Sequence, residues 1–285
     1  MVKTKPFYIL AASFTSAAAA ILSIISLSTE NWVTAKGQFV IINEPPSEIR
    51  YGLFTGLLIQ SLGGSQRIPL YVTCLVSKNV CGYLCDSGQD RQDDLEKMWN
   101  NEKVPFTCYL QHARSITTRK DANSSLIPKT ELKADDSERE FINAGLYIST
   151  VVFLGISAIF GLIAAALSVW NTAGNPIEVI VSIYGIYIYN AIACIASAVT
   201  LALWGALFGI TILHNIGIFH TIQGDMKTYD TPMLGFSYWL NVPSCMLYGA
   251  SIFILYLRDY FIRLEPEVKI HITAREKDVG DIMIF

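Results

Sequence analysis

Charged residues are scarce in this chain, because only 16% of its 285 residues are Asp, Glu, Lys or Arg. Soluble globular proteins carry about 25% charged residues, so the composition argues against a soluble enzyme or binding domain. A basic excess is also missing, since the formal net charge is −3 at pH 7. Without a basic surface, nucleic acid is not a predicted partner. Hydrophobic residues instead make up 52% of the chain, which points to a membrane protein.

Charge is absent from four long windows of the sequence. Residues 7–29, 141–177 and 231–257 contain no Asp, Glu, Lys, Arg or His, and the fourth window contains only two histidines. A helix crosses the hydrocarbon core of a bilayer with about 20 apolar residues. The windows therefore predict four transmembrane helices, at residues 7–28, 141–170, 179–219 and 233–257, with the third extending beyond the membrane. The first window could alternatively be a cleaved signal peptide, but its apolar length favours an uncleaved span.

Basic residues predict the orientation of these spans. Lys3 and Lys5 precede the first span, and several bases follow the fourth. Because basic flanks favour the cytosolic side, residues 1–6, the turn at 171–178 and the tail at 258–285 are expected in the cytosol. The segments at 29–140 and 220–232 then form extracellular loops, and the chain is expected in the plasma membrane.

The first extracellular loop holds more than half of the charged residues and predicts a small antiparallel sheet. Three segments rich in β-formers, at 32–42, 49–60 and 68–76, are separated by a Pro-Pro pair and a Gly-Gly pair. The predicted fold class is therefore a mainly α membrane protein. It is a bundle of four transmembrane helices that carries an antiparallel β-sheet formed by the first extracellular loop.

The second half of this loop has a different character. Residues 90–100 predict a short helix with Leu95, Met98 and Trp99 on one side. Residues 112–139 are polar and lack Phe, Trp and Tyr, which predicts partial disorder. We expect this half to elaborate on the sheet and to determine the choice of a particular partner.

Four of the six cysteines lie in the first loop: Cys74, Cys81, Cys85 and Cys108. An even number of extracellular cysteines predicts two disulfides, and all three possible connectivities stay open. A zinc site is the alternative, but the paired Cys-x-x-Cys spacing typical of zinc sites is missing. Cys194 and Cys245 lie within predicted spans, where free cysteines act as small buried hydrophobes.

Two short motifs predict modification and binding. Asn123 begins an Asn-Ser-Ser sequon, which accepts a glycan if the loop is extracellular. Met283 and Phe285 belong to a hydrophobic C-terminus of the kind that adds a strand to a PDZ domain. A PDZ or cytoskeletal adaptor is therefore a candidate cytosolic partner. Membrane lipids, and proteins that contact the first loop, are the other expected partners.

Motifs of catalysis and transport are missing. The sequence has no P-loop, no Gly-x-Ser-x-Gly and no His-Glu-x-x-His. Ionisable residues mark ion and proton paths in membrane proteins, and they are nearly absent from the predicted spans. We therefore expect a protein that is not an enzyme, without a catalytic, cofactor-binding or metal site.

The order of several motifs resembles one family of membrane proteins. Trp32 after the first span, followed by a Gly-Leu-Phe motif and then cysteines, resembles the claudin and peripheral-myelin-protein superfamily. Within it, the chain is most similar to the clarins. The first-loop residues that carry this resemblance are Tyr51, Gly52, Leu53, Phe54 and Gly56; those in the cytosolic turn are Asn171, Gly174, Pro176 and Glu178. Phe54 stands where claudins have a tryptophan, and the cysteine spacing differs from the claudin pair.

The resemblance implies a fold and a function. Clarin-like proteins are non-enzymatic four-span organisers or scaffolds of the plasma membrane in sensory cells. They are linked to the maintenance of hair bundles and photoreceptors and to the actin cytoskeleton. A claudin-like adhesion or barrier protein is one alternative function, and an auxiliary subunit of an ion channel is another.

Overall fold

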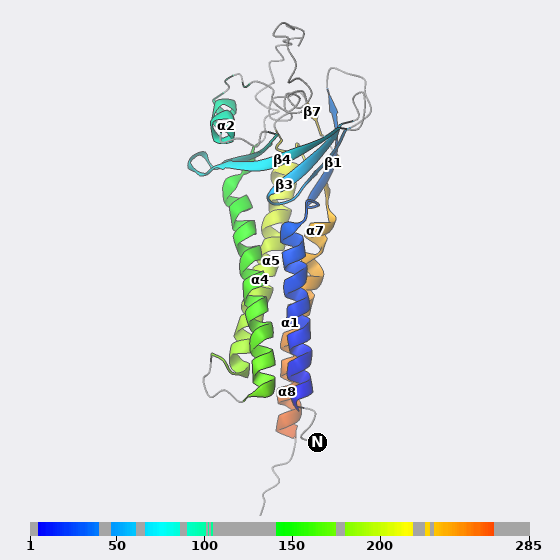
Figure 1. The fold of residues 1–285 in the computed structure, drawn as a ribbon, viewed down its shortest axis with the longest axis vertical. Coiled ribbons are helices and arrows are strands. Elements are labelled where there is room, and N and C mark those ends of the chain that lie inside the picture. The colour runs from blue at the N-terminus through cyan, green and yellow to red at the C-terminus, as the bar shows by residue number, and fades with distance from the viewer. Residues whose placement is uncertain are drawn as a thin grey trace, which may run out of the picture.

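Four long helices form a bundle in the computed structural model of this chain (Figure 1). The structure describes residues 5–39, 47–60, 66–85, 90–100, 102, 104, 141–174, 180–218, 226–228 and 231–264. The long helices are α1 (Lys5–Ser28), α4 (Ala144–Ala173), α5 (Ile183–Leu207) and α8 (Asn241–Leu264). A π-helical segment, η4 (Phe208–Ile212), continues α5, and the short helix α7 (Phe236–Trp239) precedes α8.

All four helices are long and apolar enough to cross a membrane, which confirms the predicted number of candidate spans. The candidate spans have 23, 30, 30 and 29 residues. The third ends at Ile212 rather than at residue 219, and the fourth runs to Leu264 rather than to residue 257. The fourth helix is longer than predicted because the prediction ended at the first charged residue after the apolar window. A helix ends only where its backbone hydrogen bonding ends.

The start of the fourth span also differs from the prediction. Residues 233–234, assigned to the span from sequence, form the strand β8 (Met233–Leu234). The short helix α7 ends at Trp239, and α8 begins two residues later at Asn241. Pro243 therefore lies in the first turn of α8, where its missing N–H breaks no intrahelical hydrogen bond.

Small and hydroxyl side chains fill the interior of the bundle. Helix α1 packs against α4 and α8, and α5 packs against the same two helices. One buried stripe recurs every three or four residues along α1, as expected for one face of a helix; it consists of Ala12, Ser16, Ala19, Ser23 and Ser26. Such small residues allow close approach of helices in lipid, where packing and hydrogen bonds drive association.

Hydrogen bonds connect the hydroxyl groups of this interior across the bundle. Ser16 Oγ donates to Asn190 Oδ1 on α5 at 2.7 Å and lies 2.8 Å from Ser251 Oγ on α8. Tyr248 on α8 donates to the carbonyl of Ser157 on α4 at 3.0 Å. The two pairs of diagonally opposed helices are thus each joined by a polar contact. We call this set of buried hydroxyl and amide groups the polar seam.

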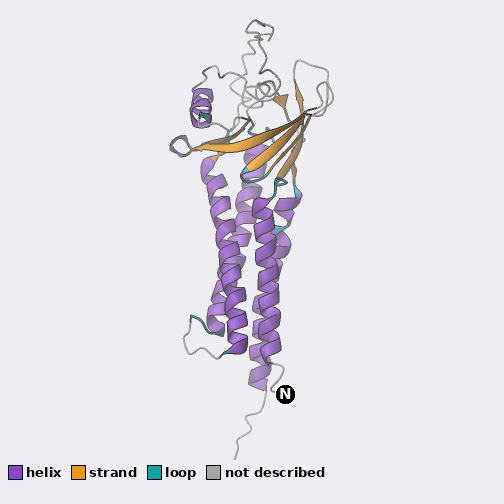
Figure 2. Cartoon of the chain, viewed as in Figure 1, coloured by secondary structure: helices purple, strands orange, loops and turns teal. Residues whose placement is uncertain are grey.

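An antiparallel sheet lies across one end of the bundle (Figure 2). Its strand order is β6-β5-β4-β3-β2-β1-β7, and β8 also pairs with β1. The strands are β1 (Val33–Phe39), β2 (Ser47–Tyr51), β3 (Thr55–Gln60), β4 (Gln66–Leu75), β5 (Val80–Leu84), β6 (Ile142–Asn143) and β7 (Met226–Lys227). The predicted sheet is confirmed, although the predicted strand at 49–60 is two strands and β5 to β8 were not predicted.

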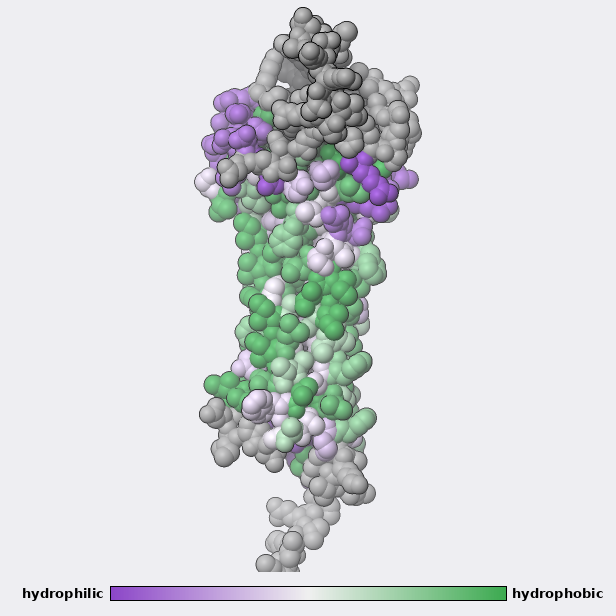
Figure 3. Space-filling model, viewed as in Figure 1, coloured by the Kyte–Doolittle hydropathy of each residue, from purple (hydrophilic) through white to green (hydrophobic). Residues whose placement is uncertain are grey.

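The predicted helix at 90–100 is confirmed as α2 (Arg91–Trp99), which packs on β4 and β5. Leu95 and Met98 are buried as expected, whereas Trp99 is 43% exposed and packs against Phe141 at 5.4 Å between ring centroids. Figure 3 shows hydrophobic surface along the bundle and hydrophilic surface near the sheet and α2. The sheet end of the molecule is therefore suited to water and the bundle to lipid.

Candidate interaction platform

Trp32 joins the sheet to the bundle. Its fully buried ring meets Trp204 of α5 edge to face at 4.9 Å and lies 6.3 Å from the ring of Tyr238 on α7. The indole N–H donates to the carbonyl of Ser26 on α1 at 2.6 Å. Because one side chain contacts three helices at once, Trp32 fixes where the sheet begins.

Two glycines allow the backbone of the sheet to approach the end of α1. A Cβ at Gly52 would collide with the carbonyl oxygen of Thr29, and a Cβ at Gly235 would collide with that of Asn31. The Gly235 N–H donates to the Trp32 carbonyl at 2.9 Å. Any larger residue at either position would push the sheet away from the bundle, because the atoms it meets are backbone.

The Gly-Leu-Phe motif places its leucine and phenylalanine side chains in different surroundings. Leu53 is buried in the core beneath the sheet, whereas Phe54 is 48% exposed. The N–H of Gly52 donates to the carbonyl of Thr55 at 2.8 Å, which closes the turn between β2 and β3. Gly56 lies so close to Tyr51 that a Cβ would be 2.6 Å from that residue's Cβ. The motif therefore builds a tight turn that faces the bundle.

Buried tyrosines fill the space between sheet and bundle. The rings of Tyr51 and Tyr83 lie 4.1 Å apart, and the Tyr83 hydroxyl donates to the Gly52 carbonyl. The Tyr51 and Tyr147 hydroxyls are buried without a hydrogen-bond partner in the described part of the chain. Burial, with Tyr147 as a neighbour, raises the pKa of Tyr51 and Tyr83 well above the ordinary value of a phenol. Both phenols therefore stay neutral at physiological pH.

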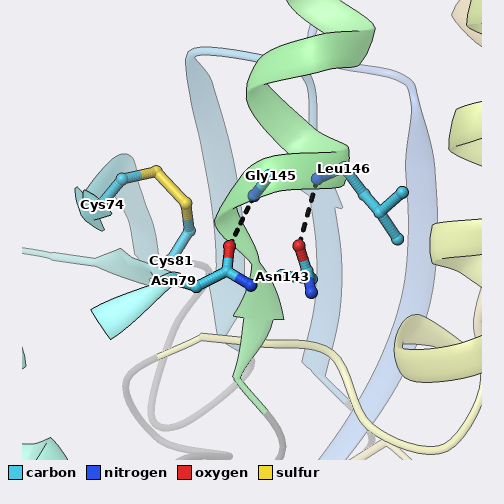
Figure 4. The surroundings of a disulfide bond; sticks show 6 residues. All are labelled: Cys74, Asn79, Cys81, Asn143, Gly145 and Leu146. Carbon is cyan, nitrogen blue, oxygen red and sulfur yellow. Dashed lines mark hydrogen bonds between the residues drawn. A yellow bond between two sulfur atoms is a disulfide. The ribbon is translucent and has the colours of Figure 1, made fainter. Parts of the chain in front are cut away.

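A disulfide-closed hairpin caps the first turn of α4 (Figure 4). Cys74 on β4 and Cys81 on β5 are paired in register and bonded. Between them, Asn79 adopts a left-handed conformation with φ of 55°, which asparagine tolerates better than most residues. Its side-chain oxygen accepts from the N–H of Gly145 at 2.8 Å, and Asn143 caps Leu146 at 3.1 Å. The hairpin thus satisfies N–H groups that the start of a helix leaves unpaired.

The tip of this hairpin carries the most exposed large hydrophobic side chain among the described residues of the first loop. Val76, at the hairpin tip in η2 (Val76–Lys78), is 72% exposed. Lys78 pairs with Glu96 of α2 at 2.8 Å, so the charges beside the tip hold α2 in place. An apolar tip with a polar rim is the arrangement typical of a protein contact. We call the outer surface of the sheet and α2 the platform.

The predicted site residues separate into several groups. In the first loop, Trp32, Tyr51, Gly52, Leu53 and Gly56 meet at the joint between sheet and bundle. In the turn, Asn171 is buried and its side-chain amide donates to the carbonyl of Val181 at 2.6 Å, so it braces α4 against the start of α5. Gly174 follows the end of α4 as its C-cap. The other predicted sites lie outside the described residues: Cys108, Asn123, Pro176, Glu178, Met283 and Phe285.

Among the described cysteines, those of the first loop are disulfide-bonded, whereas the two in the bundle are free and only half-buried rather than buried. Cys74 and Cys81 form one disulfide, and Cys85 is also disulfide-bonded. Cys194 and Cys245 are free, and their sulfur atoms lie 3.6 Å apart between α5 and α8. The two thiols therefore pack against each other where α5 meets α8.

Sequence reasoning missed Tyr83 and Gly235. Tyr83 lies in the apolar run 80–84, which could have been interpreted as a fully buried strand. Gly235 directly precedes an aromatic cluster, which gives only a weak signal.

Among the described residues, no three potential metal ligands lie together. Comparison with known proteins finds no family model and no curated protein that matches this chain, so the clarin-like interpretation depends on the motifs themselves.

Proposed function

We propose that this chain is a clarin-like, non-enzymatic organiser of the plasma membrane that crosses the bilayer four times. The observation that carries this proposal is the rigid joint between sheet and bundle. Trp32, the two close-packed glycines and the buried tyrosines hold the platform at a fixed height above the apolar helices. A surface fixed in this way can position a partner relative to the membrane without any chemical reaction.

The proposed orientation places the platform outside the cell and both termini in the cytosol. It is supported by the bases that flank the first and fourth spans, and by the sequon at Asn123, which an extracellular loop would expose. A glycosidase-sensitive mobility shift should be present in the wild type and absent in Asn123→Gln. The resemblance to clarins adds sensory cells as the proposed site of action and the actin cytoskeleton as the structure to which the tail connects.

The platform is tested by changing its apolar tip. Val76→Asp places a charge at the point where a partner would be desolvated, and it alters no buried contact. Ile180→Asp is the matched control, because Ile180 is 68% exposed at the opposite end of the bundle. In affinity capture from membranes with a proximity-labelling tag, Val76→Asp should lose partners that wild type and Ile180→Asp retain. Identical partner sets for all three chains would contradict the proposed platform.

The proposed cytosolic contact has a separate test. A chain that lacks residues 282–285 keeps the platform but loses the hydrophobic C-terminus. We expect it to lose PDZ-containing or cytoskeletal adaptors while keeping extracellular partners. Equal recovery of adaptors by the full and shortened chains would contradict an adaptor contact at the C-terminus.

One observation favours a second function, claudin-like adhesion. The tip of the β4–β5 hairpin projects to the side of the bundle in Figure 1 and carries the exposed Val76, so it is placed to reach a neighbouring molecule. Expression of the wild type would then raise cell aggregation or junctional resistance, and Val76→Asp would abolish the increase. If expression changes neither quantity, the organiser function is favoured over adhesion.

A further inference from the structure

The first turns of α5 and the last turns of α8 lie at the end of the bundle opposite the sheet (Figure 1). Residues of these two helices line a groove. Its volume is about 400 Å³, which is within the range of sites for small molecules. Four tyrosines and two charged residues dominate its lining; they are Tyr184, Tyr187, Tyr256, Tyr260, Asp259 and Arg263. None of these residues belongs to the platform.

The negative charge of the groove is held in place. Asp259 Oδ1 accepts from Arg258 Nη1 at 2.9 Å, and its Oδ2 accepts from the Tyr187 hydroxyl at 3.4 Å. Arg258 is largely buried, with a side chain only 15% exposed. The carboxylate is therefore oriented by two neighbours on different helices, and it does not depend on a ligand for its position.

The positive charge lies one helical turn away. Arg263 follows Asp259 by four residues on α8, a rise of about 6 Å. It is exposed and has no ion-pair partner among the described residues. Among the described residues, the groove therefore presents an oriented carboxylate and, one turn away, a cation without an ion-pair partner, which matches a ligand that carries both charges.

The tyrosine rings determine which cation suits the groove. Tyr184, Tyr256 and Tyr260 are 70%, 60% and 49% exposed, so their faces are available to a ligand. Aromatic faces attract organic cations, and several rings together are the arrangement that binds quaternary ammonium groups. A quaternary ammonium has no N–H to donate, so the ring faces and the negative charge of Asp259 are the contacts that it can use.

The groove also continues toward apolar surface on both helices. Ile188 lines it, and Ile195 and Phe253 lie on the same faces of α5 and α8 by helical spacing. These side chains are 55%, 64% and 59% exposed. A ligand with a charged head and apolar chains would therefore find both parts of its surface matched.

We propose that this groove binds the headgroup of a phosphatidylcholine-type lipid. The quaternary ammonium lies against the tyrosine faces near Asp259, the phosphate pairs with Arg263, and the acyl chains follow the apolar faces above. This inference rests on the proposed insertion into a membrane. It adds a selective lipid contact, at the membrane boundary where tyrosines are expected.

The test uses the full chain purified in detergent and lipids that share palmitoyl and oleoyl chains. Native mass spectrometry measures retention of phosphatidylcholine, phosphatidylethanolamine and phosphatidylglycerol. We expect phosphatidylcholine to be retained about three- to tenfold better than the other two, as cation–π contacts at a partly desolvated site allow. Equal retention of all three lipids would overturn the proposal.

Variants separate the two halves of the headgroup. Tyr256→Leu should lower phosphatidylcholine retention about threefold or more, while Tyr256→Phe, which keeps the ring, should leave it nearly unchanged. Arg263→Gln should weaken phosphatidylcholine and phosphatidylglycerol alike, and Asp259→Asn should reduce only the preference for choline. Arg50→Gln, in the sheet, is the control and should change nothing. If Tyr256→Leu and Tyr256→Phe behave alike, the aromatic contact is wrong.

Two further outcomes define what has failed. Displacement of the lipid by soluble phosphocholine at equal concentration would overturn the lipid assignment, because the acyl chains would then contribute nothing. A chain that crosses the bilayer and captures partners, but shows no choline preference, would overturn this inference and leave the proposed function standing. A chain that does not cross the bilayer would overturn the proposed function itself.

Discussion

The core beneath the sheet and the interior of the bundle are built from different side chains. The core beneath the sheet buries large aromatic groups such as Trp32, Trp204, Tyr51 and Tyr83. The bundle interior instead combines alanine and serine with hydrogen bonds of the polar seam. In water, burial of large apolar surface stabilises a fold, whereas in lipid that driving force is missing and close packing takes its place. We therefore expect a loss of side-chain volume to lower the unfolding free energy most in the core beneath the sheet. A gain of volume should instead be costly in the interior of the bundle.

The largest effect is expected from a loss of volume beneath the sheet. Trp32→Ala should cost about 3–5 kcal/mol of unfolding free energy, because a fully buried indole and its bond to Ser26 are lost. Trp239→Ala is the control, since Trp239 is 56% exposed. Denaturant titration of the chain in detergent micelles measures the unfolding free energy of both variants. Equal costs for the two variants would contradict the role of Trp32 as the joint.

Loss of the hairpin disulfide should have the next largest effect. Replacement of Cys74 and Cys81 by serine should cost about 2–3 kcal/mol, because a short loop of the unfolded chain is no longer closed. Hydrogen exchange should rise in β4, β5 and the first turn of α4, which the hairpin caps. Cys194→Ser, which removes a free thiol, should leave exchange in these segments unchanged.

Added volume should be costly inside the bundle. A Cβ at Gly161 of α4 would collide with the ring and hydroxyl of Tyr248, whereas a Cβ at Gly155 of the same helix meets nothing within 4 Å. Gly161→Ala should therefore cost about 1–3 kcal/mol. Gly155→Ala should raise the unfolding free energy by about 0.5–1 kcal/mol, because alanine has less backbone freedom to lose on folding than glycine. Thermal unfolding of the detergent-solubilised chain compares the pair, and a similar shift for both would refute close packing at Gly161.

The two stacked tyrosines offer a matched comparison of hydrogen bonding. Tyr83→Phe removes the donor to the Gly52 carbonyl and should cost about 1–2 kcal/mol. Tyr51→Phe removes a buried hydroxyl that has no partner among the described residues, so it should be neutral or stabilising. The same denaturant titration applies. A larger cost for Tyr51→Phe than for Tyr83→Phe would show that the two hydroxyls have been assigned the wrong roles.

The smallest effect is expected in the polar seam. Ser16→Ala removes the donor to Asn190, and hydrogen bonds between helices in a membrane average about 0.6 kcal/mol. The unfolding free energy should fall by about that amount, while Ser28→Ala, at an exposed position, should leave it unchanged. A cost as large as that of Trp32→Ala would remove the distinction between the two interiors.

The number of helices and the presence of the sheet could be predicted because each depends on a local signal. Windows without charge predicted the four spans, and segments rich in β-formers predicted the regions that form β1 to β4. The strands β6, β7 and β8 have two residues each, too few for any periodicity. They exist because tertiary contacts bring segments far apart in sequence beside β5 and β1.

The joint between sheet and bundle was only partly predictable. Trp32 and Gly52 belong to motifs that the sequence displays, but the reason for Gly52 is its approach to Thr29, which no spacing encodes. The groove was even harder to predict from sequence, because Tyr184 lies near the start of one apolar window and Asp259 lies just beyond the end of another. Their meeting depends on how α5 packs against α8. The sequence shows which side chains are polar, aromatic or charged, but it does not show which distant segments pack together in the fold.

We propose that the bundle crosses a membrane and holds the platform on its outer side. This proposal is tested most directly by labelling intact cells with a membrane-impermeant maleimide, using Val76→Cys and Ile180→Cys with the parent chain as background. We expect Val76→Cys to be labelled in intact cells and Ile180→Cys to be labelled only after permeabilisation. Labelling of both in intact cells, or the reverse pattern, would contradict it.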